Sequence, residues 1–538
     1  MLSVRGLRIE VRDQDGRREV VHGVSLDLKR GEILGIIGES GAGKSTIGLA
    51  AMGYAKEGCR IASGSVNFDG IEMTEISERE LERLRGIRIA YVAQSAASFF
   101  NPAFTLIEQF SEVLVKKKLA TKSEARLRGC GLYRELGLPD PDHIGDRYPH
   151  QLSGGQLQRA MIAMAMATDP DLIIFDEPTT ALDVTTQLDV LSAVRGALRK
   201  SASAAIYITH DLALVAQIAT HVMVMRHGEL VEQAPTHQLL SDPQKPYTAD
   251  LIREKTPEIG TVAAQKDAYP VLHVENVFAG YGKQGNVLED VTVKIERSHT
   301  VAVVGESGSG KSTLARVVCG LLPANAGHIF FNNRELEPSF EKRRRDTLRR
   351  IQIVYQIPDL ALNPGLKIGE VIGRPLAFYH GMKGKKNRDR VAELLEALEL
   401  KPAYADRYQD QLSGGEKQRV SIARALAAEP DLIICDEITS ALDQLVAVEV
   451  LKTLARLKTD FGVSYMFITH DMNTVKSIAD DVVVMRRGKV IDQGTKDYVF
   501  SPPFNPYTEL LLTSTPEMDP GWLDRTQQAR AASRKRAG

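Results

Sequence analysis

Long apolar runs and paired cysteines are both missing from this 538-residue chain. A transmembrane helix needs about 20 consecutive apolar residues, and no stretch reaches that length, so no membrane span is expected. The N-terminus lacks a basic segment followed by an apolar one, which argues against a signal peptide. The scattered cysteines indicate reduced thiols in a cytosolic protein rather than a zinc site or a disulfide framework. They are Cys59, Cys130, Cys319 and Cys435.

The chain also has little net charge. Its 68 Lys and Arg residues nearly balance its 69 Asp and Glu residues, which gives a formal charge of −1. A large basic surface for nucleic acid is therefore not expected. The length exceeds what one hydrophobic core usually supports, so two or more domains are expected.

Two glycine-rich stretches depart from this ordinary composition. Residues 38–46 and 305–313 both match G-x-x-x-x-G-K-[ST], and each follows an apolar run and precedes helix-forming residues. Backbone N–H groups in such a loop surround a phosphate, the lysine bridges the β- and γ-phosphates, and the next hydroxyl can bind Mg²⁺. The predicted phosphate-binding residues are Gly38, Glu39, Ser40, Gly41, Ala42, Gly43, Lys44, Ser45, Thr46, Gly305, Glu306, Ser307, Gly308, Ser309, Gly310, Lys311, Ser312 and Thr313.

The second half of the chain repeats the first. Both halves contain a Gln after a short apolar strand, then Leu-Ser-Gly-Gly, an apolar run ending in Asp-Glu, and Ile-Thr-His-Asp. From Ser153, which matches Ser413, the offset stays at 260 residues, which indicates a tandem duplication. We therefore predict a first domain over 1–255, a linker over 256–270, a second domain over 271–520 and a basic disordered tail over 521–538.

Coarse secondary structure follows from these landmarks. Near-continuous apolar runs at 172–175, 205–208, 432–435 and 465–468 are typical of buried parallel strands. The charged, leucine-containing segments 105–138 and 368–400 are predicted to be helical. The segments 222–232 and 482–493 are predicted to be hairpins.

Hydrolysis of a bound nucleotide requires charge stabilisation and a positioned water. Asp-Glu and a lone histidine are common solvated groups at strand ends, but here both recur at one offset after a phosphate loop. Glu177 and Glu437 are predicted general bases, and His210 and His470 are predicted to contact the γ-phosphate and the water. The predicted Mg²⁺ ligands are Ser45, Gln94, Asp176, Ser312, Gln356 and Asp436.

In this order, the motifs resemble the nucleotide-binding subunits of ATP-binding cassette (ABC) transporters. Leu-Ser-Gly-Gly-Gln at 152–156 and Leu-Ser-Gly-Gly-Glu at 412–416 look like that family's signature motif. The resemblance implies an α/β fold with two tandem P-loop NTPase domains, each with a RecA-like core, an antiparallel β subdomain and a helical subdomain. It also implies that ATP and Mg²⁺ bind between the phosphate loop of one domain and the signature of the other. The signature contacts would be Ser153, Gly154, Gly155, Ser413, Gly414 and Gly415.

The chain departs from the family pattern at three points. The family usually places an aromatic ring before the phosphate loop to stack on adenine. Tyr281 can serve in the second half, but residues 1–30 contain no Phe, Tyr or Trp, so weaker nucleotide binding is expected at the site using Lys44. Ile438 stands where proline is usual, and Glu416 replaces the last signature glutamine. Neither change removes a phosphate or magnesium ligand, so both sites are expected to hydrolyse ATP.

Finer features resemble the peptide, opine and nickel importer branch. They are Tyr-Pro-His-Gln at 148–151, Asn-Pro after Gln94 and Gln356, and Pro-Tyr-Thr near each domain end. The resemblance implies the ATPase of an importer of peptides or peptide-like solutes at the cytoplasmic face of the inner membrane. Two permease subunits, docked on the segments after Gln94 and Gln356, and an extracytoplasmic binding protein would be its partners.

Other double-cassette proteins remain as alternatives. One is a monosaccharide-type importer ATPase, which would share fewer of these finer features. Another is a soluble ATPase acting on ribosomes, for which the linker here is short. A DNA-repair or chromosome ATPase would carry zinc cysteines or an inserted coiled coil. No cysteine follows Cys435, so the iron–sulfur centre of some relatives is not expected.

Overall fold

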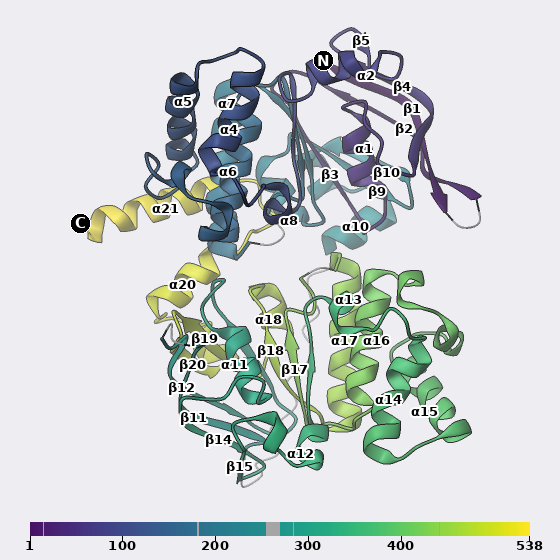
Figure 1. Ribbon diagram of the computed structural model, residues 1–538, viewed down its shortest axis with the longest axis vertical. Coiled ribbons are helices and arrows are strands. Elements are labelled where there is room, and N and C mark those ends of the chain that lie inside the picture. The colour runs from purple at the N-terminus through teal and green to yellow at the C-terminus, as the bar shows by residue number, and fades with distance from the viewer. Residues whose placement is uncertain (14–15, 180–181, 254–268, 283–284, 441, 538) are drawn as a thin grey trace. The chain divides into compact units, whose positions relative to one another are not determined.

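The computed structural model describes residues 1–13, 16–179, 182–253, 269–282, 285–440 and 442–537 (Figure 1). The chain forms two compact units. The first comprises Met1–Glu254 together with Pro516–Gly538, and the second comprises Lys255–Thr515. Nearly all of the predicted linker 256–270 lies outside the described residues.

A six-stranded sheet forms the centre of the first unit, in the order β10-β9-β3-β8-β7-β6. Its neighbouring strands run parallel except β9 and β10, which form the predicted hairpin. The strands are β3 (Ile33–Gly38), β6 (Ile89–Val92), β7 (Leu172–Asp176), β8 (Ala204–Ile208), β9 (His221–Arg226) and β10 (Glu229–Pro235).

An antiparallel sheet and a set of helices complete this unit. The sheet, in the order β2-β1-β4-β5, contains β1 (Leu2–Asp13), β2 (Gly16–Leu28), β4 (Cys59–Phe68) and β5 (Ile71–Glu72). The helices are α1 (Lys44–Ala50), α2 (Glu78–Leu84), α3 (Ala96–Phe99), α4 (Leu106–Lys116), α5 (Lys122–Glu135), α6 (Gly154–Met166), α7 (Val184–Ser201), α8 (Leu212–Ile218), α9 (Thr236–Ser241), α10 (Pro246–Arg253) and α21 (Trp522–Ala537).

The second unit repeats both sheets. Its central sheet has the order β16-β17-β18-β13-β19-β20, and its antiparallel sheet has the order β12-β11-β14-β15. The strands are β11 (Leu272–Ala279), β12 (Leu288–Ile295), β13 (Thr300–Val304), β14 (Ala326–Phe331), β15 (Arg334–Glu335), β16 (Ile351–Val354), β17 (Leu432–Asp436), β18 (Ser464–Ile468), β19 (Asp481–Arg486) and β20 (Lys489–Thr495).

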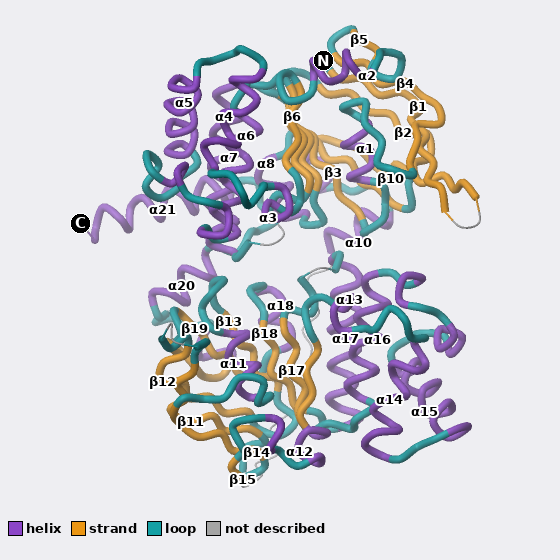
Figure 2. Tube along the Cα trace, in the orientation of Figure 1, coloured by secondary structure: helices purple, strands orange, loops and turns teal. Residues whose placement is uncertain are grey.

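The helices of the second unit follow the same plan. They are α11 (Lys311–Val318), α12 (Arg345–Arg350), α13 (Pro358–Ala361), α14 (Ile368–His380), α15 (Gly384–Ala397), α16 (Gly414–Leu426), α17 (Gln444–Phe461), α18 (Met472–Ile478), α19 (Lys496–Val499) and α20 (Pro506–Thr513). Within each unit the antiparallel sheet and the helical segment lie on opposite sides of the parallel sheet (Figure 2). The predicted α/β class, with three subdomains in each half, is confirmed.

The sequence pattern explains this layering. Leu172, Ile173, Ile174 and Phe175 of β7 are all fully buried, because a parallel sheet is covered by helices on both faces. In β11, buried positions alternate with partly exposed ones over much of the strand, as expected for an antiparallel sheet with one face in the core. The predicted helical segments 105–138 and 368–400 each form two helices rather than one.

The prediction of a disordered tail over 521–538 is wrong for the described residues. The chain forms helix α21 from Trp522 to Ala537, and Pro516–Gly538 packs with the first unit. Trp522 and Leu523 are buried there. The prediction weighed only the basic residues near the end, whereas the buried apolar pair at the start of α21 favours packing.

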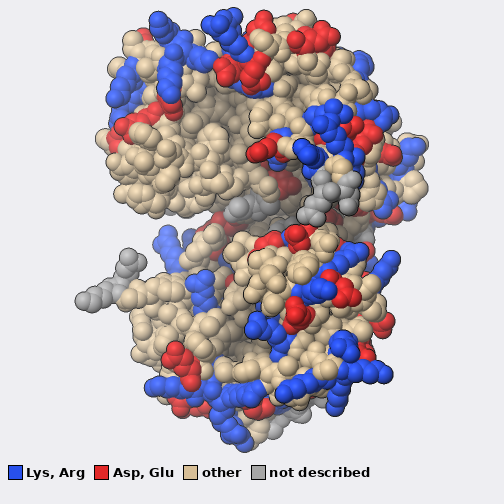
Figure 3. Space-filling view, turned by 45° about the vertical axis from the view of Figure 1, so that its right-hand side comes forward, with Lys and Arg blue, Asp and Glu red and all other residues tan. Residues whose placement is uncertain are grey.

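The surface carries charges of both signs. On the face drawn in Figure 3, Lys and Arg side chains lie among Asp and Glu side chains. This mixed surface fits the near-zero net charge. None of the described helices is long and apolar enough to cross a membrane.

Candidate functional site

The first phosphate loop joins β3 to α1. Gly38 and Gly43 have φ angles of 147° and 90°. A Cβ atom on Gly38 would lie 2.1 Å from the carbonyl oxygen of Met225, so only glycine fits at the strand end. The Lys44 ammonium is buried and donates to the carbonyl oxygens of Gly38 at 2.7 Å and Glu39 at 2.8 Å. This lysine is therefore held over the loop before any ligand binds.

The second loop, between β13 and α11, has the same geometry. Gly305 has a φ angle of 149°, and a Cβ there would lie 2.2 Å from the carbonyl oxygen of Met485. Lys311 donates to the carbonyl oxygens of Gly305 at 2.8 Å and Glu306 at 2.9 Å. Both predicted loops thus form the strand, loop and helix arrangement that the sequence indicated.

A carboxylate and a hydroxyl meet beside each loop. Ser45 Oγ donates to Asp176 Oδ1 at 2.7 Å, and Ser312 Oγ donates to Asp436 Oδ1 at 3.0 Å. Both predicted pairs therefore come together as oxygen donors at the ends of β7 and β17. Burial raises the pKa of Asp436, and the neighbouring charge of Glu437 adds to that rise.

Tyr91 gives the first site a contact that sequence reasoning missed. Its hydroxyl donates to Asp176 Oδ2 at 2.6 Å, and burial together with this hydrogen bond raises the pKa of Tyr91. In the second half, the residue that matches Tyr91 is Ile353, three residues before Gln356. This difference was the only signal in the sequence. Because isoleucine has no hydroxyl, the surroundings of Asp176 and Asp436 differ.

The two predicted general bases share an uncommon backbone conformation. Glu177 and Glu437 have φ angles of 48° and 50°, in the left-handed region that costs non-glycine residues about 1–3 kcal/mol. Their N–H groups donate to the carbonyl oxygens of Ile208 and Ile468 at 2.9 and 3.0 Å. This turn directs the glutamates away from the line of the strand.

Each glutamate side chain lies between a glutamine and a histidine. Gln94 Nε2 donates to Glu177 Oε2 at 3.0 Å, and His210 Nδ1 lies 3.5 Å from Glu177 Oε1. In the second unit, Gln356 and His470 hold Glu437 in the same way, at 2.9 and 3.6 Å. The structure thus brings together the glutamine, glutamate and histidine of each half.

Electrostatics favour an ion pair at each of these histidines. Burial opposes the imidazolium form, but the hydrogen bond and charge of the adjacent glutamate outweigh it and raise the pKa of His210 and of His470. Burial also opposes the charged form of Glu437, yet His470 lowers its pKa. Because folding raises the pKa of His470 and lowers that of Glu437, this pair stabilises the fold fully between about pH 4.5 and pH 6.5. The contribution is lost as the pH rises through the folded histidine pKa or falls through the folded glutamate pKa.

We expect Glu437→Gln to lower the pKa of His470, because burial still opposes the imidazolium form while the hydrogen bond and charge of the carboxylate are lost. Imidazole signals followed by NMR during a pH titration would measure this, with His470→Gln giving the assignment. His210 is the internal control and should keep its pKa. An unchanged pKa at His470 would show that Glu437 does not stabilise the imidazolium.

The signature serines cap the helices that follow them. Ser153 Oγ accepts from the Gln156 N–H at 3.3 Å, and Gln156 Oε1 accepts from the Ser153 N–H at 3.1 Å. Ser413 and Glu416 form the same reciprocal pair at the start of α16. Glu416 therefore does what glutamine does in the first half, which explains why this departure from the family pattern is tolerated.

Within each signature, the first and second glycines have different surroundings. A Cβ on Gly155 would lie 2.5 Å from Thr186 Cγ2, and one on Gly415 would lie 2.4 Å from Val446 Cγ1. These glycines let the signature helix pack against the next helix. Gly154 and Gly414 have open space around the same position. Their contact with a nucleotide stays a prediction.

Tyr281, the predicted adenine-stacking residue, lies near α11. Its ring is partly exposed, and its hydroxyl accepts from Arg316 Nη1 at 2.9 Å. An aromatic face that remains accessible is available to a planar base, and stacking of a base contributes about 1–3 kcal/mol in nucleic-acid complexes.

We expect ATP to bind more tightly to the site of Lys311 and Tyr281 than to the site of Lys44, by about 5-fold or more. Calorimetric ATP titrations of Lys44→Ala and Lys311→Ala would compare the one site left in each variant. Tyr281→Ala in the Lys44→Ala background should remove the difference. Equal affinities in the two single variants would contradict the expected asymmetry.

Comparisons with known proteins agree with this geometry. The sequence matches the family described as ABC transporter over residues 21–180 and 288–440. Residues 491–538 match the family described as Oligopeptide/dipeptide transporter, C-terminal region.

Individual proteins are similar over different lengths. The glutathione import ATP-binding proteins GsiA of Shigella boydii serotype 4 and Salmonella choleraesuis are each 36% identical to the chain, over 97% of its length and 90% of theirs. Among solved structures, cbiO1 from Clostridium perfringens, described as part of the ABC transporter complex cbiONQ, is 30% identical. It covers 44% of the chain, and 92% of its own length, with a TM-score of 0.40.

Proposed function

The chain belongs to the ABC transporter family, and from that membership we propose that it drives import of peptides or peptide-like solutes. It is an ATPase whose hydrolysis is coupled to transport. The import of peptide-like solutes is supported by the GsiA proteins, named for glutathione import, and by the C-terminal match. The observation that carries the proposal is the duplicated set of phosphate loop, Ser–Asp pair and Gln–Glu–His cluster.

Each site is proposed to hold ATP with Mg²⁺. The hydroxyl of Ser45 and the carboxylate of Asp176 are hard oxygen donors already in contact, and oxygen donors suit Mg²⁺. Ser312 and Asp436 provide the same pair in the second site. When bound, the ion supplies positive charge that stabilises the negative charge developing on the phosphates. Lys44 and Lys311 would contact the β- and γ-phosphates from their places over the loops.

The glutamates are proposed to accept a proton from the attacking water. Gln94 and His210 each contact one carboxylate oxygen of Glu177, so together they fix its orientation. Each carboxylate oxygen keeps a further lone pair, which can accept the proton from water. Burial opposes the imidazolium form of His210, but Glu177 raises the pKa of this histidine, and the imidazole would lie near the γ-phosphate of bound ATP. Glu437, Gln356 and His470 would act in the same way.

The signatures are proposed to complete the sites in the ATP-bound state. Ser153 and Ser413 precede α6 and α16, and with the N–H groups at the start of these helices they would bind an anion. Each would bind the γ-phosphate of the ATP held by the other cassette. ATP would then join the cassettes, and hydrolysis would release them.

Two membrane permeases and an extracytoplasmic binding protein are proposed partners, and the chain is proposed to lie with them on the cytoplasmic face of the inner membrane. After Gln356 a pocket of about 590 Å³ opens beside α14. Leu366, Val371 and Phe378 are among its lining residues, and Leu360 nearby is 84% exposed. An apolar pocket beside an exposed leucine suits an apolar helix end from a permease.

We expect Leu360→Asp to weaken assembly with the permeases about 10-fold or more, because a charge would enter an apolar contact. Leu321→Asp, at another exposed leucine of the same cassette, is the matched control. Glu108 is a poor probe of the first docking surface because it caps α4 through Thr105. Co-purification of the tagged variants measures assembly, and normal recovery of permeases with Leu360→Asp would contradict this docking site.

Identification of the bound partners tests the proposed function. The variant with Glu177→Gln and Glu437→Gln, purified with ATP under mild detergent, should bring two polytopic membrane proteins. Their binding protein, once found, should take peptides in preference to monosaccharides. Recovery with ribosomal particles and without membrane proteins would overturn the transport proposal.

A further inference from the structure

The C-terminal end of the chain is attached to the first cassette, although the residues before it belong to the second. Helix α21, yellow in Figure 1, lies beside α7 and α8. We call Pro516–Arg530 the C-terminal clasp. The interactions described below lie within the first compact unit.

Gln217 on α8 binds the clasp backbone. Its side chain is 4% exposed, and its Nε2 donates to the carbonyl oxygens of Glu517 at 2.7 Å and Asp519 at 2.9 Å. Its Oε1 accepts from the Leu523 N–H at 3.0 Å. One buried amide thus makes three hydrogen bonds to the clasp, and it would lose them if the clasp left.

Side chains of α7 bind the other face of the clasp. The buried guanidinium of Arg195 forms an ion pair with Asp524, and Asp189 lies 3.1 Å from Arg530 Nη1. Gln527 and Ser192 share a hydrogen bond. The clasp also buries Trp522 and Leu523, the latter completely. We call Gln217, Arg195, Asp189 and Ser192 the clasp receptor. Because Arg195 and Gln217 are buried polar groups that bind the clasp, they indicate a specific contact.

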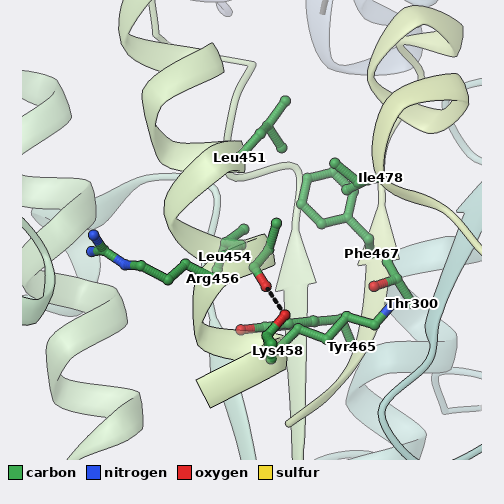
Figure 4. A pocket seen from close by; sticks show the side chains of 10 residues that line it. Thr300, Leu451, Leu454, Arg456, Lys458, Tyr465, Phe467 and Ile478 are labelled. Atoms are coloured by element: carbon green, nitrogen blue, oxygen red, sulfur yellow. Dashed lines mark hydrogen bonds between the residues drawn. The ribbon is translucent and has the colours of Figure 1, made fainter. Parts of the chain in front are cut away.

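The second cassette lacks this receptor. At the offset of 260 residues, the positions of Gln217, Arg195 and Ser192 are occupied by Ser477, Ala455 and Lys452. Ala455, the counterpart of Arg195, lines a pocket of about 300 Å³ together with residues of α17 and β18 and the last residue of α18. Figure 4 shows Leu451, Leu454, Phe467 and Ile478 around it. The receptor is therefore specific to the first cassette and not a feature of the duplicated fold.

No predicted nucleotide-binding residue takes part in these contacts. On α7 they run from Asp189 to Arg195, several residues after the start of the helix at Val184. On α8 they involve Gln217, at the opposite end from His210, which precedes the helix. ATP binding and clasp binding therefore use different residues.

We propose that the clasp is a nucleotide-independent tether that keeps the second cassette attached to the first after ATP is hydrolysed. The chain would then connect the cassettes at two places, through the 256–270 segment and through the docked clasp. Two attachments raise the effective concentration of one cassette at the other, so the next closure on ATP becomes faster.

A cleavable chain tests this tether directly. A protease site inserted within 259–268 of the full-length protein is cut after folding, and the fragments are analysed by gel filtration without nucleotide. We expect the two fragments to remain together. Asp524→Arg, which places a cation against Arg195, should weaken their association about 30-fold or more. Asp524 is about half exposed, so this change should leave the first cassette folded.

Two further variants sharpen the test. Arg195→Asp combined with Asp524→Arg should restore association. Lys452→Ala, at the position of the second cassette that matches Ser192, should change nothing. Asp524→Arg is also combined with Glu177→Gln and Glu437→Gln. ATP should bring the cut fragments of this protein together again, because association through ATP uses the phosphate loops and signatures and not the clasp. The proposal would be overturned if the cut wild-type fragments separated. It would also be overturned if the cut Asp524→Arg fragments stayed together without nucleotide.

Discussion

Replacing Glu177 and Glu437 together by glutamine is expected to lower ATP hydrolysis by about 100- to 10,000-fold while ATP still binds. Each glutamate directly follows a buried strand and has a left-handed conformation, and a glutamine and a histidine hold its carboxylate. Glutamine keeps the size of the side chain but cannot accept a proton at pH 7. The phosphate loops are untouched, so affinity for ATP should change little.

Phosphate release and calorimetric ATP binding, measured on the same protein, separate these two effects. Glu429→Gln is the matched control, because Glu429 also has a positive φ of 51° but lies outside the sites. Each single substitution should stop hydrolysis at its own site. Hydrolysis that persists in the double variant would mean that another group takes the proton.

Lys311→Ala is expected to weaken ATP binding at the second site about 100-fold or more, and Lys44→Ala should do the same at the first. The ammonium of each lysine is buried and held by two loop carbonyl oxygens, so it is positioned without cost when the phosphates arrive. Hydrogen bonds to charged groups contribute about 1.5–3 kcal/mol each, and two are lost.

Calorimetric titration with ATP measures the loss, and thermal unfolding without nucleotide shows whether the fold is kept. Lys294→Ala, which removes an exposed lysine of β12 outside the loop, serves as the control and should bind ATP normally. Binding of ATP to Lys311→Ala at wild-type affinity, with the Lys44 site also removed, would contradict the role of the loop lysines.

Local chemistry explains what the sequence could predict. A phosphate loop needs glycine where the backbone turns back on its strand, and a Cβ on Gly38 or Gly305 would collide with a neighbouring carbonyl oxygen. Strands buried on both faces read as apolar runs, and β7 and β17 begin where those runs begin. The loops, the Ser–Asp pairs and the glutamate clusters could therefore be located from motif spacing.

Tertiary contacts explain what the sequence could not predict. The hydrogen bond from Tyr91 to Asp176 joins two strands that are far apart in the sequence, so no local sequence pattern predicts it. The clasp depends on Gln217 and Arg195, which are ordinary helix residues until α21 packs on them. The basic end of the chain suggested a solvated tail, and the buried Trp522 and Leu523 were the stronger signal.

Counting the ATP molecules retained by the chain tests the central claim most directly, namely that both halves form working ATP sites that close on each other. The Glu177→Gln and Glu437→Gln protein, loaded with Mg²⁺ and ATP and passed over gel filtration, should retain about two ATP molecules per chain at the mass of one chain. Ser153→Arg together with Ser413→Arg should lose both by blocking the signatures. Retention of one ATP or none by the unblocked protein, or of two with both signatures blocked, would contradict the account.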